Sequence, residues 1–152
     1  MHRYIAIDGK GGSGKTHLTN LLEKKLGVPV FHLDEYGNDY EPFVGIPRLV
    51  EELKNIDASL VIFEGVGVFK SDFDEFNAFK ILVDVTDEVR KDRVGGRDVP
   101  TDERSQEEWN KIFDIWIRAE SEYFTDELAS KADLIVGAEY NVDEIISTLP
   151  LR

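Results

Sequence analysis

The sequence predicts an α/β protein built around a parallel β-sheet with helices on both faces. Short apolar segments alternate with longer segments whose apolar residues recur at helical spacing, and this alternation is typical of parallel sheets covered on both sides. The first apolar segment runs directly into a glycine-rich loop, and a helical segment follows that loop. A chain of 152 residues is long enough to bury a core, so we expect a single domain, residues 1–152.

The first two strands and the helix between them come at the start of the chain. Residues 3–8 are predicted to form a buried strand because they are mostly apolar. The next helix is predicted from leucines at spacings of three and four and from a glycine placed to end it: Leu18, Leu21, Leu22, Leu26 and Gly27. Residues 28–33 are predicted as the second strand, near a sheet edge because Pro29 lacks an N–H group.

The middle of the chain continues the alternation. Residues 34–46 are predicted as a loop, and Pro47 begins a short helix. The third strand covers the fully apolar residues 60–63 and ends at Glu64, and the fourth covers residues 79–85.

The last third contains a long helix, a strand and a final helix. Ser105 and Glu108 have the spacing of a capping box, which predicts where the long helix begins. Its large apolar residues recur at spacings of three and four, and we interpret them as core packing rather than base stacking: Trp109, Ile112, Phe113, Trp116, Tyr123 and Phe124. Residues 133–136 are predicted as the fifth strand, and Asn141 caps the last helix.

The glycine-rich loop carries the most specific motif in the chain. Residues 9–16 match G-x-x-x-x-G-K-[ST], the P-loop pattern, between a strand and a helix. Its glycines let backbone N–H groups point at phosphate oxygens, Lys15 adds a cation, and the Thr16 hydroxyl suits Mg²⁺. The predicted nucleotide-binding residues are Gly9, Gly11, Gly12, Ser13, Gly14, Lys15, Thr16 and His17.

Composition excludes several classes of function. The chain has no cysteine, which excludes disulfides and thiolate catalysis and is compatible with a cytoplasmic protein. A net charge of −13 makes nucleic acid and anionic membranes poor partners. No stretch has the length and apolarity of a membrane span or the pattern of a signal peptide. Nothing in the sequence indicates an oligomeric state.

Acidic residues follow the second and third strands. Asp34 comes after residues 28–33 and Glu64 after residues 60–63. Ligands of parallel sheets bind at the carboxyl ends of the strands, so both carboxylates should share a crevice with Lys15 and Thr16. One carboxylate would organise Mg²⁺ and the other would accept a proton from an attacking hydroxyl. The alternatives are a turn residue for Asp34 and an ordinary strand end for Glu64.

A basic segment interrupts this acidic chain at residues 89–97. Arg90, Lys91, Arg93 and Arg97 occur there with a single acid, Asp92. Arginine suits bidentate contacts with phosphate, so Arg93 and Arg97 are predicted to stabilise charge in phosphate transfer. The alternative is a solvated helix end whose basic residues complement the helix dipole.

Taken together, these segments resemble the uridine kinases, the nicotinamide riboside kinases and related small-molecule P-loop kinases. The matching features occur in the family's order: the P-loop, Asp34 with Tyr36, residues 61–65, Arg93 with Arg97, and residues 132–136. The resemblance implies a three-layer P-loop NTPase fold with strand order 2-3-1-4-5. It implies ATP and Mg²⁺, with Asp34 as the base, Thr16 and Glu64 as metal ligands, and residues 137–140 near the adenine. It also implies that Arg93 and Arg97 belong to a lid, at about residues 90–104, that closes over the phosphates.

The region that builds the acceptor pocket in uridine kinases is much shorter here. Only 29 residues separate Asp34 from Glu64. The side chains that remain either line a smaller pocket or pack within the loop: Tyr36, Asp39, Tyr40, Phe43 and Arg48.

The predicted function is transfer of the γ-phosphate of Mg-ATP to a hydroxyl of a small molecule such as a nucleoside or riboside, with Lys15, Asp34, Arg93 and Arg97 as catalytic residues. The alternative is a nucleotide-binding regulatory module or NTPase, a degenerate kinase without an acceptor. Residues 130–133 resemble the guanine-recognition motif of GTPases. They precede the fifth strand, at the wrong end for a ligand, so we interpret the likeness as coincidence.

Overall fold

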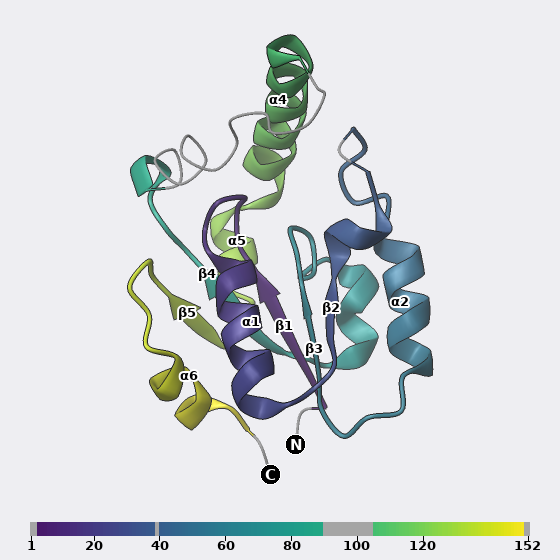
Figure 1. The fold of residues 1–152 in the computed structure, drawn as a ribbon, viewed down its shortest axis with the longest axis vertical. Helices are drawn as coiled ribbons and strands as arrows, with labels where there is room; N and C mark the ends of the chain where they lie inside the picture. The colour runs from purple at the N-terminus through teal and green to yellow at the C-terminus, as the bar shows by residue number, and fades with distance from the viewer. Residues whose placement is uncertain (1–2, 39, 90–104, 151–152) are drawn as a thin grey trace.

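The computed structural model describes residues 3–38, 40–89 and 105–150. These residues contain a five-stranded sheet in the order β2-β3-β1-β4-β5, with every neighbouring pair parallel. The strands are β1 (Tyr4–Asp8), β2 (Val30–His32), β3 (Val61–Glu64), β4 (Phe79–Val83) and β5 (Leu134–Val136). The predicted order is confirmed, with the P-loop strand β1 in the centre and β2 at an edge (Figure 1).

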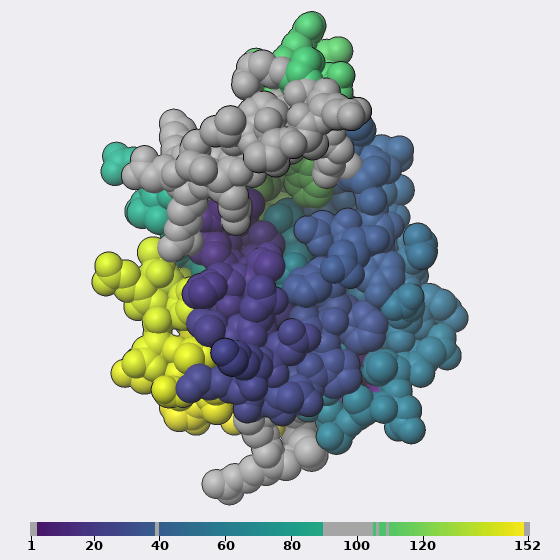
Figure 2. All heavy atoms as spheres, viewed as in Figure 1, coloured from purple at the N-terminus to yellow at the C-terminus, as the bar shows by residue number. Residues whose placement is uncertain are grey.

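Helices cover both faces of the sheet, as predicted. They are α1 (Lys15–Leu26), α2 (Ile46–Asn55), α4 (Gln106–Tyr123), α5 (Asp126–Ala129) and α6 (Val142–Thr148), with 3-10 helices η1 (Leu33–Tyr36) and η2 (Ser71–Phe76). The short elements η1, η2 and α5 were not predicted, because four to six residues give too little periodicity to detect. The space-filling view shows α1 in the middle of one face, with α6 on one side and the β2–α2 region on the other (Figure 2).

The alternation of side chains along the strands divides the core into two clusters. Along β1, Tyr4 and Ala6 belong to one buried cluster, and Ile5 and Ile7 belong to the other. The first cluster packs under α2, η2 and α5, and the second packs under α1 and α6. This two-sided burial explains why the strands are almost continuously apolar in sequence.

Three helix ends agree with the predicted caps. Gly27 ends α1 with φ 63° and donates its N–H to the Glu23 carbonyl. The Ser105 hydroxyl accepts from the Glu108 N–H at 3.1 Å. The Asn141 side chain accepts from two N–H groups in the first turn of α6. These contacts satisfy backbone groups that a helix end otherwise leaves unpaired.

The long helix α4 projects beyond the carboxyl ends of the strands, and its last turns reach the body of the protein (Figure 1). Of the apolar stripe predicted to pack in the core, Ile112 is buried, and Tyr123 and Phe124 pack against the first core cluster. Ile117, which is not part of that stripe, is 57% exposed. Periodicity predicts that one face of a helix is covered, but it does not say by what.

No helix in the described ranges is long and apolar enough to cross a membrane.

Gly65 fixes the geometry of the chain just after β3, and we expect Gly65→Ala to destabilise the fold. Its φ is 149°, and an added Cβ would lie 2.6 Å from the Leu33 Cβ. A strained backbone together with a steric clash predicts a loss of about 2–4 kcal/mol in the free energy of unfolding. Gly137→Ala is the matched control, because an added Cβ there meets nothing within 4 Å. Urea denaturation checks both, and equal effects would contradict the prediction.

Candidate functional site

The P-loop joins β1 to α1 and adopts a tight turn that requires glycine. The Ser13 N–H donates to the Lys10 carbonyl at 3.1 Å, and Gly12 and Gly14 have φ values of 77° and 94°. An added Cβ on Gly9 would lie 2.6 Å from the Val83 carbonyl oxygen of β4. The loop therefore lies directly against the sheet, with the N-terminus of α1 behind it, an arrangement that favours anions.

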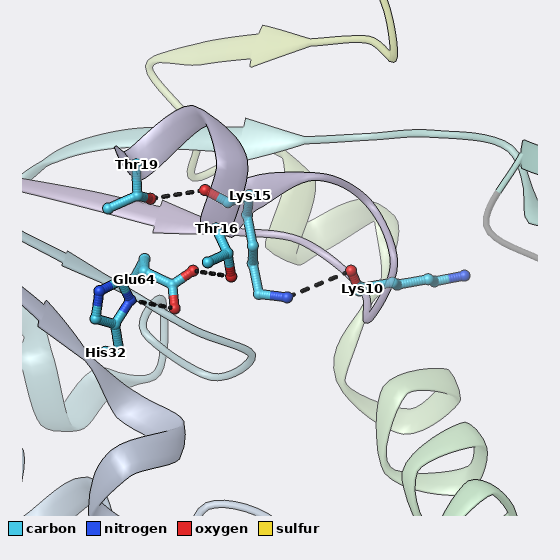
Figure 3. Close-up of polar contacts among 6 residues, drawn as sticks. All are labelled: Lys10, Lys15, Thr16, Thr19, His32 and Glu64. Carbon is cyan, nitrogen blue, oxygen red and sulfur yellow. Dashed lines mark hydrogen bonds and ion pairs between the residues drawn. The ribbon is translucent and has the colours of Figure 1, made fainter. Parts of the chain in front are cut away.

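The two lysines of the loop point in different directions (Figure 3). The Lys15 side chain reaches back across the loop, where its Nζ lies 3.5 Å from the Lys10 carbonyl oxygen. The Lys10 side chain points away from the site (Figure 3) and lies 3.9 Å from an Asp87 carboxylate oxygen. Only Lys15 is therefore placed over the loop, as the motif predicts.

His17 is exposed on the first turn of α1, one residue beyond the motif. Its ring lies 6.4 Å, centroid to centroid, from the ring of Tyr140. This contact brings the segment 137–140 beside the phosphate-binding end of α1. That the segment passes near the adenine, as the resemblance implies, stays a prediction.

Glu64 lies beside Thr16 at the carboxyl end of β3. The Thr16 hydroxyl donates to Glu64 Oε2 at 3.2 Å, and His32 Nδ1 lies 3.1 Å from Glu64 Oε1 (Figure 3). Glu64 is only 2% exposed. The hydrogen bond to Glu64 is the main reason why the pKa of His32 lies above its usual value of 6.5. His32 is thus a site residue that the sequence did not indicate, although β2 and β3 place it in register with Glu64.

The Thr16 and Glu64 oxygens fit a magnesium site shared with nucleotide phosphates. Mg²⁺ prefers oxygen ligands and is usually held by one or two protein groups, with water and phosphate oxygens completing the shell. Among residues 3–38, 40–89 and 105–150, no group of three or more His, Cys, Asp or Glu side chains is arranged to hold a metal by itself. A hydroxyl and one carboxylate at the P-loop meet the smaller requirement, because the substrate supplies the remaining ligands.

A cavity of about 330 Å³ opens in front of these residues. It brings together Lys15, Thr16, Asp34 and Glu64, which come from three different strand ends. The rest of its wall comes from the P-loop, the segment after β2, the turn after β3 and α4: Gly11, Leu33, Gly37, Asn38, Glu41, Phe43, Val44, Gly45, Gly65, Val66 and Trp116. Burial, and next the charge of Glu64, raise the pKa of Asp34. The four residues predicted to share a crevice therefore line one cavity.

The shortened region after Asp34 forms part of this cavity wall. Of the side chains suggested for an acceptor pocket, Phe43 lines the cavity. Tyr36 instead donates to Glu52 of α2, with the Arg48 guanidinium 5.7 Å from its ring centroid. Tyr40 is 48% exposed, and Asp39 lies outside the described residues. Trp116, which we expected in the core, lines the cavity from α4, so the pocket has an aromatic wall from two distant segments.

Asp8 is a buried polar residue of the site that sequence reasoning missed. It is the last residue of β1 and is fully buried. Its carboxylate accepts from the backbone N–H groups of Gly9 at 2.7 Å and Phe69 at 3.1 Å, and from the Tyr123 hydroxyl. These contacts tie the start of the P-loop to the segment after β3 and to the end of α4. The sequence feature that could have indicated Asp8 is a charged residue at the end of an otherwise apolar strand.

Asp8 should make the stability of the protein depend on pH. Burial raises the pKa of Asp8 from 3.8 to about 6, against its hydrogen bonds, which lower the pKa. As the pH rises, the Asp8 carboxyl therefore ionises at a lower pH in the unfolded chain than in the folded protein. Asp8 stabilises the fold most below pH 4, and the free energy of unfolding falls by about 3 kcal/mol as the pH rises to 6. The Asp8→Asn variant has no carboxyl group at this position and so lacks this pH dependence. The difference in unfolding free energy between the two proteins, measured in urea at pH 4, 5, 6 and 7, should fall over this range; a constant difference contradicts the prediction.

Two other predictions concern the basic segment and the GTPase-like segment. Arg93, Arg97 and the lid at about residues 90–104 lie outside the described residues. Asp133 of the GTPase-like segment 130–133 accepts from the Lys80 N–H at 2.9 Å and donates its own N–H to the Lys80 carbonyl. These contacts hold the start of β5 against the start of β4, at the opposite end of the strands from the P-loop. They agree with our interpretation that the likeness is coincidental.

Comparisons with known proteins support the fold. No family model matches the sequence, and a search of curated proteins finds no match. Among solved structures, a shikimate kinase from Acinetobacter baumannii in complex with shikimate is 17% identical with a TM-score of 0.60, covering 97% of this chain and 92% of that chain. A possible uridine kinase from Bacillus stearothermophilus is 21% identical with a TM-score of 0.59, covering 89% and 88%. A protein from Thermus thermophilus titled TT1252 is 22% identical with a TM-score of 0.63, covering 97% and 96%. At these identities the likeness concerns the fold alone.

Proposed function

We propose that this protein transfers the γ-phosphate of Mg-ATP to a hydroxyl group of a small molecule. The observation that carries the proposal is that Lys15, Thr16, Asp34 and Glu64 line the same cavity. A P-loop alone supports only phosphate binding. A carboxylate across a cavity from the loop can also accept the proton of an acceptor hydroxyl. The solved structures of similar fold, which include shikimate kinase and a possible uridine kinase, agree with this class of reaction.

Each residue has a separate role in the proposed reaction. The P-loop N–H groups and Lys15 hold the outer phosphate oxygens and position them for in-line transfer. Thr16 and Glu64 hold Mg²⁺, which when bound neutralises charge on the phosphates. His32 fixes the orientation of the Glu64 carboxylate through its Nδ1 contact. Asp34 orients the acceptor hydroxyl and takes its proton.

The remaining parts of the proposal come from the sequence. Arg93 and Arg97 would stabilise the charge on the transferred group. A cytoplasmic location and a single domain over residues 1–152 are expected from composition and length. The proposed acceptor is a small alcohol such as a nucleoside or riboside, with its hydroxyl in the cavity of about 330 Å³.

An acceptor screen tests the proposed function. The protein is incubated with Mg-ATP and a panel of nucleosides, sugars and vitamin precursors, and ADP formation is followed with and without each compound. We expect at least one acceptor to raise ADP formation above the rate with water alone and to give a phosphorylated product by mass spectrometry. Failure of every compound would instead favour the second candidate, a nucleotide-binding regulatory module.

A further inference from the structure

The end of helix α4 contacts the P-loop through a buried carboxylate. Glu120 is 5% exposed, and its Oε1 accepts from the Gly11 N–H at 2.8 Å. The contact is close, since an added Cβ on Gly11 would lie 3.2 Å from the same oxygen. Glu120 is therefore an anion bound to a backbone N–H of the loop whose motif is built to bind anions.

A second side chain on the same face of α4 holds the helix in place. Tyr123 is three residues after Glu120, so the two side chains are neighbours on the helix surface. The Tyr123 hydroxyl donates to Asp8 and accepts from the Phe69 N–H at 3.0 Å. Because Asp8 binds the Gly9 N–H, α4 is linked to the loop directly at Gly11 and, through Asp8, at Gly9.

The charge of Glu120 distinguishes its contact from that of Tyr123. A bound nucleotide brings several negative charges to the loop, and a carboxylate a few ångströms away repels them strongly in a partly buried site. The neutral Tyr123 hydroxyl exerts no such repulsion. Binding of phosphate should therefore weaken or displace the Glu120 contact and leave the Tyr123 contact unchanged.

We propose that Glu120 is a phosphate-responsive positioning residue: its carboxylate competes with nucleotide phosphate for the Gly11 N–H and links the occupancy of the P-loop to the position of α4. The proposal rests on the proposed nucleotide site but not on phosphoryl transfer. It also concerns the cavity, because Trp116, one turn before Glu120, lines the same cavity as Gly11 and Lys15.

Nucleotide affinity provides the first test. Calorimetry measures the binding of Mg-ADP and of adenosine to the wild type, Glu120→Gln, Glu120→Ala and Glu122→Gln. Glu122 is an exposed carboxylate on the same turn and serves as the charge control. We expect both Glu120 variants to bind Mg-ADP about tenfold tighter or more, with unchanged adenosine affinity, and Glu122→Gln to resemble the wild type.

Fluorescence provides the second test. The chain has two tryptophans, so Trp109→Phe leaves Trp116 as the only one. In this background we expect Mg-ADP to change the Trp116 emission, and Glu120→Ala without nucleotide to have emission shifted toward that of the nucleotide-bound protein. Adenosine should have no such effect.

The outcomes separate this proposal from the proposed function. Unchanged or weaker Mg-ADP binding by Glu120→Gln, which keeps the size and the hydrogen-bond acceptor, would overturn the role of Glu120. Tighter binding without any acceptor-dependent transfer would support Glu120 while removing the kinase proposal. If no variant binds Mg-ADP, both proposals are overturned.

Discussion

Replacing Lys15 with methionine should reduce kcat/KM for Mg-ATP by about 10³-fold, or about 4 kcal/mol of transition-state stabilisation. Among the described residues that line the cavity, Lys15 is the only lysine or arginine. The chain as a whole has a net charge of −13, so attraction for a polyphosphate at this site must be local. Methionine keeps most of the length and apolar bulk of the side chain while removing its charge.

Lys10→Met is the matched control for this experiment. Lys10 belongs to the same loop, but its side chain points away from the cavity toward Asp87 (Figure 3). Steady-state kinetics with the acceptor found in the screen, together with calorimetric binding of Mg-ATP, would compare the two variants. We expect Lys10→Met to stay within about threefold of the wild type, because exposed ion pairs contribute little. Equal losses in both variants would mean that net charge, rather than the position of Lys15, governs the site.

The part of the site that the sequence predicted depends on the geometry of parallel sheets. Alternating apolar strands imply that strand ends with the same direction share one edge. Asp34 and Glu64 could therefore be placed opposite the P-loop although they lie 18 and 48 positions after Thr16. The cavity that contains all three follows from the same rule. The pattern was informative because both residues stand at or just after the carboxyl end of a strand.

The parts that the sequence did not reveal depend on contacts between distant segments. Glu120 bonds to Gly11 across 109 positions, and Tyr123 bonds to Asp8 across 115. No local pattern marks such pairs, and helical periodicity explained Tyr123 equally well as an ordinary core residue. Trp116 was assigned to the core for the same reason. The orientation of α4 relative to the sheet decides these contacts, and it is a property of tertiary packing.

His32 falls between these two cases. Its register opposite Glu64 follows from the pairing of β2 with β3, which the resemblance implied through the strand order. His32 lacks the spacing of a metal-ligand set, so the sequence pattern assigned it no role. A histidine at a strand end beside a carboxylate can instead orient that carboxylate, and this role requires no spacing motif.

Asp34→Asn should lower kcat by about 10² to 10⁴-fold while leaving the affinity for Mg-ATP nearly unchanged, because general-base catalysis contributes factors of this size. Asparagine keeps the shape of the side chain but does not take up the proton of the acceptor hydroxyl. Glu35→Gln is the control, since Glu35 is the next carboxylate along η1 and, unlike Asp34, does not line the cavity. Single-turnover transfer and equilibrium binding of Mg-ATP measure the two effects separately. A variant that transfers phosphate at the wild-type rate would remove Asp34 from the reaction.

The pH dependence of the wild type tests the same role without a substitution. Burial and the neighbouring Glu64 raise the pKa of Asp34, and a base must be ionised to accept a proton. The rate should therefore fall on acidification at a pH above that expected for an ordinary aspartate, and remain constant as the pH rises beyond it. Because Asp34→Asn has no carboxyl group at this position, its residual rate should lack this acid limb. An acid limb that persists in the variant would assign the titration to another group, and His32, whose pKa is also raised, would be the first one to substitute.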